Sequence, residues 1–390
     1  MKARRRIALL SACALTVLLL GCRTQPKQER KSADQLKSAD LDRVRMAAER
    51  GDSKAQFDLG RMLYEGDVLP EDYSEAAKWF SKAAEQGNAK AQDSLGSMYS
   101  VGLGVQQDDA EAVCWYRKAA DQGDADAQFG LGVMYADGRG VAEDDVQALR
   151  WIRKAAEQGN AGAEDELGER YSKGKGVAKD HGQSVIWFGK AAEQGDFQAL
   201  ISLINMYDGG EGVPVDHSEA VRWLRIGARK GNAYFQRLLA ERLAVGVYMR
   251  QDDTEAVFWY RKAADQRDSL AQDELGDRYY EGRGVLQDYP EAASWFRKSA
   301  EQGGDYGQYR LGLMYARGEG VPLDYMEAYM WLNLAAAEAP VGRYRDERVK
   351  ERDSVAGKMT AQQIAEAQRR AREWNPKGWR GKLPYRDRPR

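Results

Sequence analysis

Apolar residues follow two helical patterns within a unit of 36 residues that is copied along the chain. In residues 124–137, Ala127, Leu131, Met134 and Tyr135 fall at i, i+4, i+7 and i+8, on one face of an α-helix. A second apolar pattern of helical period follows a short loop and contains a tryptophan. This tryptophan recurs every 36 residues, as Trp79, Trp115, Trp151, Trp187, Trp223, Trp259, Trp295 and Trp331. A fixed period of about 20–50 residues indicates a solenoid, so the pattern predicts an all-α fold of about eight helix-turn-helix repeats.

Polar residues and glycines mark the ends of both helices. An aspartate in each copy precedes the tryptophan helix, and a Glu or Gln follows three residues later, which predicts a capping box. These aspartates are Asp72, Asp108, Asp144, Asp180, Asp216, Asp252, Asp288 and Asp324. Six copies also hold a glycine within the first helix, such as Gly132. Glycine there costs about 1 kcal/mol relative to alanine, so a neighbouring helix is expected to approach too closely for a side chain.

Loop, caps and both helices together resemble the Sel1-like repeat family, relatives of the tetratricopeptide repeat. Residues 124–159, DADAQFGLGVMYADGRGVAEDDVQALRWIRKAAEQG, are similar to a complete copy, and the resemblance covers 52–339. It implies an α/α superhelical solenoid that presents a concave groove to partner proteins. Four positions depart from the pattern: Ile204 and Ala240 replace the first-helix glycine, Tyr248 a loop glycine, and Arg267 a glycine after the second helix. We expect distorted packing there.

The two ends of the chain differ from the repeats. Residues 1–21 combine basic residues with a short apolar run, which predicts a signal peptide. Leu19 to Cys22 resembles a bacterial lipobox, which implies lipid attachment at Cys22 and an outer-membrane lipoprotein facing the periplasm or the cell surface. Residues 22–40 are polar and predict a disordered tether. Residues 41–51 and 340–375 predict capping helices, and 376–390 a basic flexible tail.

Composition and charge exclude several functional classes. The net charge is −2, and charges of both signs interleave, so no nucleic-acid-binding surface is predicted. Without the signal peptide and with Cys22 lipidated, Cys114 is the only free thiol, for which we expect a packing role. His181 and His217 occupy the same position in successive repeats, too far apart to share a metal ion. No catalytic constellation is found, so no enzyme activity, metal or cofactor is predicted.

Variable positions of the first helix predict a partner-binding surface. They lie three residues before and one residue after the first-helix glycine, on the side opposite the apolar face. The −3 residues are Phe57, Asp93, Phe129, Asp165, Ile201, Arg237, Asp273 and Tyr309. The partner-binding residues predicted at +1 are Arg61, Val133, Glu169, Asn205, Glu241, Asp277 and Leu313. We call this surface the helix-one face, and we expect it to be exposed because charges recur at −3.

Three functions remain open from the sequence. The first is a lipid-anchored protein–protein interaction scaffold of the bacterial envelope, which binds a protein or peptide in the concave groove. The second is a structural organiser of an outer-membrane polysaccharide export complex. The third is a β-lactam hydrolase-like enzyme, which the missing catalytic residues disfavour. The sequence favours the first.

Overall fold

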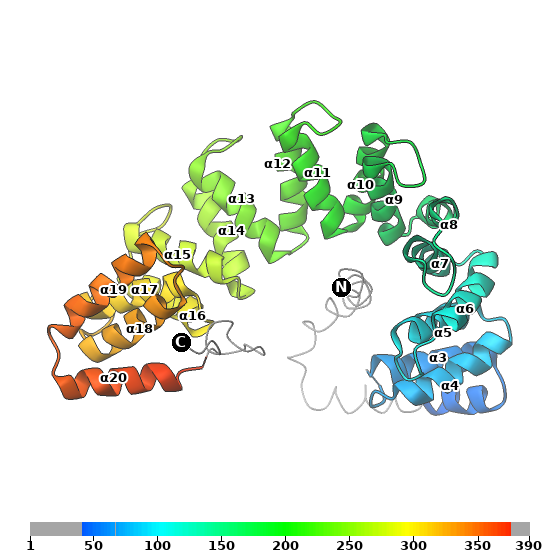
Figure 1. Cartoon of the computed structure of the whole chain (residues 1–390), viewed down its shortest axis with the longest axis horizontal. Coiled ribbons are helices and arrows are strands. Elements are labelled where there is room, and N and C mark those ends of the chain that lie inside the picture. Colours follow the sequence, from blue (N-terminus) through cyan, green and yellow to red (C-terminus); the bar gives the residue numbers. More distant parts are fainter. Residues whose placement is uncertain (1–40, 67, 376–390) are drawn as a thin grey trace. The chain divides into compact units, whose positions relative to one another are not determined.

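The computed structural model describes residues 41–66 and 68–375, and this part of the chain is helical throughout, without strands (Figure 1). Residues 41–49 are helical. The first helices of the repeats are α3 (Ser53–Glu65), α5 (Ala89–Val101), α7 (Ala125–Asp137), α9 (Ala161–Lys173), α11 (Phe197–Gly209), α13 (Ala233–Val245), α15 (Ser269–Glu281) and α17 (Asp305–Arg317). The second helices are α4 (Tyr73–Glu85), α6 (Asp109–Asp121), α8 (Asp145–Glu157), α10 (His181–Gln194), α12 (His217–Arg229), α14 (Asp253–Asp265), α16 (Tyr289–Glu301) and α18 (Tyr325–Glu338). The fold is an all-α solenoid, as predicted.

Two compact units divide the chain between Val215 and Asp216. The first holds α3 to α11, and the second holds α12 to α18 followed by α19 (Arg343–Ala356) and α20 (Ala361–Glu373), which both pack against α18. No helix among the described residues is long and apolar enough to cross a membrane. The predicted signal peptide, Cys22, the tether and the basic tail lie outside the described residues.

The two helices of a repeat meet where a glycine lies against a bulky side chain. A Cβ atom added to Gly132 would lie 2.6 Å from Ile152, and one added to Gly168 would lie 2.7 Å from Phe188. The bulky residue always directly follows the tryptophan. It is buried in every repeat, as Phe80, Tyr116, Ile152, Phe188, Leu224, Tyr260, Phe296 and Leu332. The predicted close approach is therefore confirmed.

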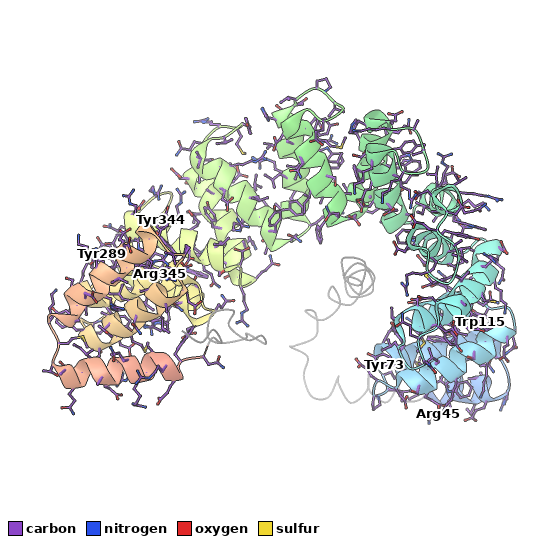
Figure 2. All side chains as sticks on the ribbon, in the orientation of Figure 1. Arg45, Tyr73, Trp115, Tyr289, Tyr344 and Arg345 are labelled. Atoms are coloured by element: carbon purple, nitrogen blue, oxygen red, sulfur yellow. The ribbon has the colours of Figure 1, made fainter. Side chains whose placement is uncertain are left out.

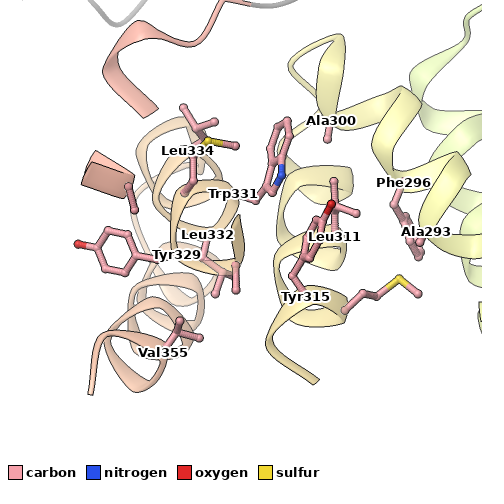
Figure 3. Packing of buried hydrophobic residues seen from close by; sticks show 14 of the residues in the cluster. Ala293, Phe296, Ala300, Leu311, Tyr315, Tyr329, Trp331, Leu332, Leu334 and Val355 are labelled. Carbon is pink, nitrogen blue, oxygen red and sulfur yellow. The ribbon is translucent and has the colours of Figure 1, made fainter. Parts of the chain in front are cut away.

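The recurring tryptophan has a more peripheral position than its neighbour. Trp151, Trp223, Trp295 and Trp331 are buried, but Trp79, Trp115, Trp187 and Trp259 are half-buried. A lysine three residues later covers the indole in several repeats, with Lys118 Nζ 3.7 Å from the ring centre of Trp115. Figure 3 shows Trp331 and Leu332 within the core cluster that α18 shares with α17. The tryptophan ring thus lies at the edge of the core, where one side packs on apolar residues and its face can bind a lysine.

Helix caps differ from the predicted capping box. Each recurring aspartate accepts a hydrogen bond from the backbone N–H three residues later, as Asp72 does from Glu75 at 2.9 Å. Among the described helices, only Thr360 and Gln363 form both bonds of a capping box. In the last three repeats the glutamate instead accepts the indole N–H one turn later, as Glu291 does from Trp295 at 2.9 Å. The prediction of a capping box is therefore wrong for the repeats, and in the last three the tryptophan binds the carboxylate that would have completed it.

Tyr248 and Arg267, which replace glycines of the repeat, adopt the backbone conformation that glycine has in other copies. Tyr248 has φ 61° and Arg267 has φ 70°, the left-handed region that glycine occupies in other copies. Tyr248 is exposed, and its ring stacks on that of His217 with centroids 3.4 Å apart. The expected distortion is therefore wrong for these two loops, because their backbone adopts the conformation of the other copies although a non-glycine residue is strained there.

A row of buried glutamines joins consecutive repeats. Gln92 Nε2 donates to the carbonyl oxygen of Ala84 at 3.0 Å, and Gln92 Oε1 accepts from Gln122 Nε2 at 2.7 Å. The same pair of bonds recurs at Gln128 and Gln272. Such bonds satisfy carbonyl groups at the ends of α4, α6, α12, α14 and α16, which would otherwise be buried without a partner. They fix the register of one repeat on the next.

We predict opposite effects of alanine at two helical glycines. Gly132→Ala should destabilise the protein by about 1–3 kcal/mol, because its Cβ would overlap Ile152 and crowd the backbone of α8. Gly189→Ala on α10 is the control, since its Cβ would meet nothing within 4 Å. It should stabilise the protein by about 0.5–1 kcal/mol through helix propensity. Chemical denaturation measures both changes, and equal shifts of the same sign would contradict the packing.

Candidate functional site

The structure places the helix-one face between core and solvent. At −3, seven of the eight residues are half-buried, and Asp273 is buried with 7% of its surface exposed. At +1, Arg61 and Asn205 are exposed, and Val133, Glu169, Glu241, Asp277 and Leu313 are half-buried. The expectation that a charge excludes burial at −3 is therefore wrong for Asp273.

The residues around the buried Asp273 also differ from those of most other repeats. Ser299 and Gly307 stand where most repeats carry two alanines, as Ala119 and Ala127 do. A Cβ atom added to Gly307 would lie 2.8 Å from Asp273 Oδ1 and 2.7 Å from Ser299 Oγ. The glycine therefore makes room for both polar atoms. Burial, together with Asp277, Asp305 and Glu274, raises the pKa of Asp273 from 3.8 to about 8, although the nearby Ser299 hydroxyl opposes the shift.

The aromatic residues predicted to contact a partner also pack between repeats. Phe57 lies 5.7 Å from the ring of Phe80, and Phe129 borders the core formed by α8 and α9. Tyr309 packs against the core of the last repeat. Each is half-buried, so one part of the ring contacts the protein and another faces solvent. Their role in partner binding stays a prediction.

Several charged members of the helix-one face bind one another. Arg237 contacts Glu241 and lies 3.3 Å from Asp268, which caps the next first helix. Asp277 lies 2.5 Å from Arg310. The Arg237–Glu241 pair lies within α13, whereas the pairs with Asp268 and Arg310 connect neighbouring first helices, so part of the variation at −3 and +1 serves contacts between repeats.

Two cavities on the helix-one face collect five of the predicted residues. The first, in the second unit, measures about 520 Å³ and contains Tyr309 and Leu313. We call it the tyrosine pocket. The second, in the first unit, measures about 280 Å³ and contains Asp165, Glu169 and Asn205. We call it the acidic pocket. Phe57, Asp93, Ile201 and the other predicted residues line neither cavity.

The tyrosine pocket lies between α17 and the capping helix α19. Four tyrosines line it, together with Leu313, Met314 and Pro340. They are Tyr280, Tyr306, Tyr309 and Tyr344. Tyr344, labelled in Figure 2, is 67% exposed at the start of α19 and forms the rim. A wall of half-exposed tyrosines offers large apolar area at low entropic cost, a composition typical of protein-binding surfaces.

Internal polar contacts hold the tyrosine rings in place. Tyr280 donates its hydroxyl proton to Glu319 at 2.8 Å, and Tyr306 donates to Asp277 at 2.8 Å. Burial and the charge of Glu347 raise the pKa of Tyr309 to about 12, so its hydroxyl stays protonated and donates to Glu347 at 3.3 Å. The pocket thus presents ordered faces of Tyr280, Tyr306 and Tyr309.

The sequence did not reveal Tyr280, Tyr306, Arg310 or Tyr344 as site residues. The first three lie on first helices, but at positions outside −3 and +1. Tyr344 lies beyond the register, on a helix whose place in the fold the period does not define. The one available signal is the concentration of tyrosines after residue 278.

The described residues contain one group of carboxylates close enough to hold a cation. Asp93, Asp124 and Asp126 have oxygens within 4.8 Å of one another. Lys90 Nζ lies 3.4 Å from Asp124 and 3.3 Å from Asp126, so a lysine ammonium already neutralises part of this charge. Burial, then Asp124 and Asp126, raise the pKa of Asp93 to about 7. Nothing further in this group indicates a bound metal.

Cys114 is a free thiol on the exposed surface of α6. The expected packing role is therefore wrong, because the Cys114 side chain faces solvent.

Comparison with known proteins supports the repeat assignment. A family model described as Sel1 repeat matches residues 53–88, 89–124, 125–160, 161–196, 198–232, 233–268, 269–304 and 305–339. The crystal structure of a Sel1 repeat protein from Oxalobacter formigenes is 33% identical, with 87% of this chain and 99% of that chain covered and a TM-score of 0.57. A protective antigen of uropathogenic Escherichia coli is 28% identical, with 86% and 94% covered and a TM-score of 0.50. Comparison with curated proteins finds no match.

We predict that ionisation of Asp273 weakens the second unit as the pH rises. The pKa is higher in the folded state than in the unfolded state, so the folded state binds the proton more tightly. The stabilisation is complete below about pH 4 and is lost as the pH rises through about 8. Hydrogen exchange of α15 to α17 should therefore be slower at pH 5 than at pH 8, after correction for the intrinsic rate.

Asp273→Asn should remove this dependence, since the amide does not titrate. Asp121→Asn, an exposed residue at the end of α6, is the control and should leave it unchanged. The same pH dependence of α15 to α17 in Asp273→Asn and wild type would show that another group is responsible.

Proposed function

Because this chain belongs to the Sel1 repeat family, we propose that it is a lipid-anchored scaffold of the bacterial envelope that binds another protein on its helix-one face. Sel1 repeat proteins generally act as protein-interaction scaffolds. The observation that carries the proposal is the tyrosine pocket, a cavity of about 520 Å³ on the face whose residues vary most among the repeats.

The tyrosine pocket has the composition and the order that a binding site needs. Its rings are held by carboxylates and by arginines, with the Arg310 guanidinium 4.6 Å from the ring centre of Tyr280 and that of Arg348 5.7 Å from Tyr309. Ordered side chains lose little entropy when a partner binds. Tyrosine and arginine are also enriched among the residues that dominate binding energy.

Lipid anchoring rests on the sequence. The basic residues, the short apolar run and the lipobox-like Leu19 to Cys22 support a lipidated Cys22. The relative from Escherichia coli is described as a protective antigen, which is compatible with a place in the envelope. No observation on the described residues favours the polysaccharide-export or β-lactam alternative.

We predict that Tyr344 contacts the partner. A photo-cross-linking amino acid at position 344 should capture one specific protein in intact cells. Position 258 is the control, because Phe258 is a comparably exposed aromatic on the second helix α14 and lines neither pocket. Equal capture at both positions, or none at 344, would contradict a site on the helix-one face.

Truncation of the same residue tests its energetic contribution. Tyr344→Ala should weaken partner capture by roughly fivefold or more, the effect of losing about 1 kcal/mol. Its thermal stability should change little, since the side chain is 67% exposed. Phe258→Ala provides the matched measurement on the other helix.

We also predict that Cys22→Ser abolishes fatty-acid labelling and releases the protein from the membrane fraction. Cys114→Ser is the control, because Cys114 is an exposed thiol within the repeats. It should retain both labelling and membrane association. Continued fatty-acid labelling of the Cys22→Ser protein would show that the lipid is attached elsewhere.

A further inference from the structure

The acidic pocket lies between α9 and α11 of the first unit. Asp165, Glu169, Ser172 and Lys173 of α9 form one side of it. The other side is formed by Gln198, Ser202, Asn205 and Met206 of α11 and by Glu211 in the loop that follows. Asp165, Glu169 and Asn205 are at −3 and +1, so this pocket belongs to the helix-one face of two successive repeats.

Acidic side chains outnumber basic ones in the lining of the acidic pocket. Three carboxylates, Asp165, Glu169 and Glu211, line the cavity with one cation, Lys173. Lys173 pairs with Glu169, and its side chain is 53% exposed, so it covers one carboxylate from the solvent side. The remaining lining groups are neutral amides and hydroxyls, apart from two apolar side chains. Carboxylates therefore outnumber cations among the side chains that line the cavity.

The floor of the acidic pocket is apolar. Phe188 and Met206 line it, and both are 4% exposed. A long basic side chain matches this arrangement, because its aliphatic part can cover an apolar floor while its charged end meets carboxylates at the rim. Arginine in particular forms paired hydrogen bonds with carboxylates.

The spacing of the carboxylates argues against a bound metal ion. Among the described residues, only Asp93, Asp124 and Asp126 form a group with oxygens within 4.8 Å of one another. The three carboxylates of the acidic pocket are too far apart to do so. A guanidinium or ammonium group on a long stem can instead approach one or two of them at a time.

Neighbouring repeats extend the negative charge along the same unit. Asp93 and Asp126 lie on α5 and α7, and Lys90 is the cation that pairs with Asp126. Burial and then the charges of Asp124 and Asp126 raise the pKa of Asp93 to about 7, whereas Lys90 opposes the shift. A ligand with several basic residues would meet carboxylates on more than one repeat.

We propose that the acidic pocket binds a lysine or arginine side chain from a basic, extended segment of the partner protein. The inference rests on the proposed function, since it names the chemistry of a partner that binds the helix-one face. Charge complementarity between the acidic pocket and the basic segment carries it. Such attraction raises the association rate and selects basic partners over acidic ones.

The test uses the full-length lipoprotein in detergent and a fluorescein-labelled peptide of alternating glycine and arginine, read by fluorescence anisotropy. The paired change Asp165→Asn with Glu211→Gln should weaken binding at least tenfold. The matched control, Glu157→Gln with Glu193→Gln, alters two exposed carboxylates on α8 and α10 and changes the net charge equally. It should bind as wild type. A peptide with glutamine in place of arginine should not bind.

For a second variant we predict stronger peptide binding, and this variant changes no buried group. Lys173→Gln removes the cation of the acidic pocket and should strengthen peptide binding about threefold or more. Lys175→Gln, an exposed lysine outside the pocket, is its control and should have no more than a minor effect. Glu211→Gln alone changes an exposed residue and should weaken binding even if the double variant fails to fold.

Three results would overturn the proposal. Equal losses in the pocket variant and its charge-matched control would show general attraction to an acidic protein. Loss of peptide binding on addition of millimolar calcium at constant ionic strength would show a cation site. Absence of peptide binding at low salt would exclude a basic ligand. Cross-linking at position 344 distinguishes these failures from failure of the proposed function, because it reports partner binding at the tyrosine pocket.

Discussion

The contact between a first-helix glycine and the bulky residue after the tryptophan governs how six of the eight repeats are built. Without a Cβ atom at Gly132, the backbone of α7 approaches Ile152 on α8 closely enough to bury that side chain completely. The closeness sets the position of the two helices and so decides which other residues of the first helix reach the core. Residues at −3 and +1 are left at the boundary, where packing constrains them less. The variable face is therefore a consequence of the glycine contact.

Contacts between repeats use polar groups to an unusual extent. Buried glutamines connect the end of one second helix to the end of the next. In the fifth repeat both glutamines of the pair are replaced together, by Leu200 and Lys230. Phe235 and Gly227 show the same coupling of volume, since a Cβ on Gly227 would lie 2.6 Å from the ring of Phe235. Ser299 and Gly307 replace the alanines of most other repeats, and together they leave room for the buried carboxylate of Asp273. Substitutions in one repeat thus require compensation at its neighbour, because each repeat contacts only adjacent ones.

Both pockets occur where this compensation leaves space on the helix-one face. In the second unit, α19 follows the last repeat but lacks its pattern, and the gap beside α17 is lined by tyrosines whose hydroxyls are bound internally. In the first unit, α9 and the loop after α11 bring carboxylates to the rim above Phe188 and Met206. The first surface supplies ordered apolar area, and the second supplies charge. A scaffold with both can combine affinity with selection of its partner.

The sequence determined the repeat, the helix pairs, the capping aspartates and the close approach at glycine, because these depend on local periodicity and on residues that recur in one register. It also indicated which first-helix positions vary. Tertiary structure alone decided what those positions do: Asp273 is buried, Arg237 joins two repeats, and Asp165, Glu169 and Asn205 share a cavity. In the last three repeats the glutamate expected to complete a capping box binds tryptophan instead, and Tyr248 and Arg267 adopt the left-handed backbone that glycine has in other copies. The physical reason is that periodicity specifies the face on which a residue lies, whereas burial and pairing depend on side chains that neighbouring helices bring to the same place.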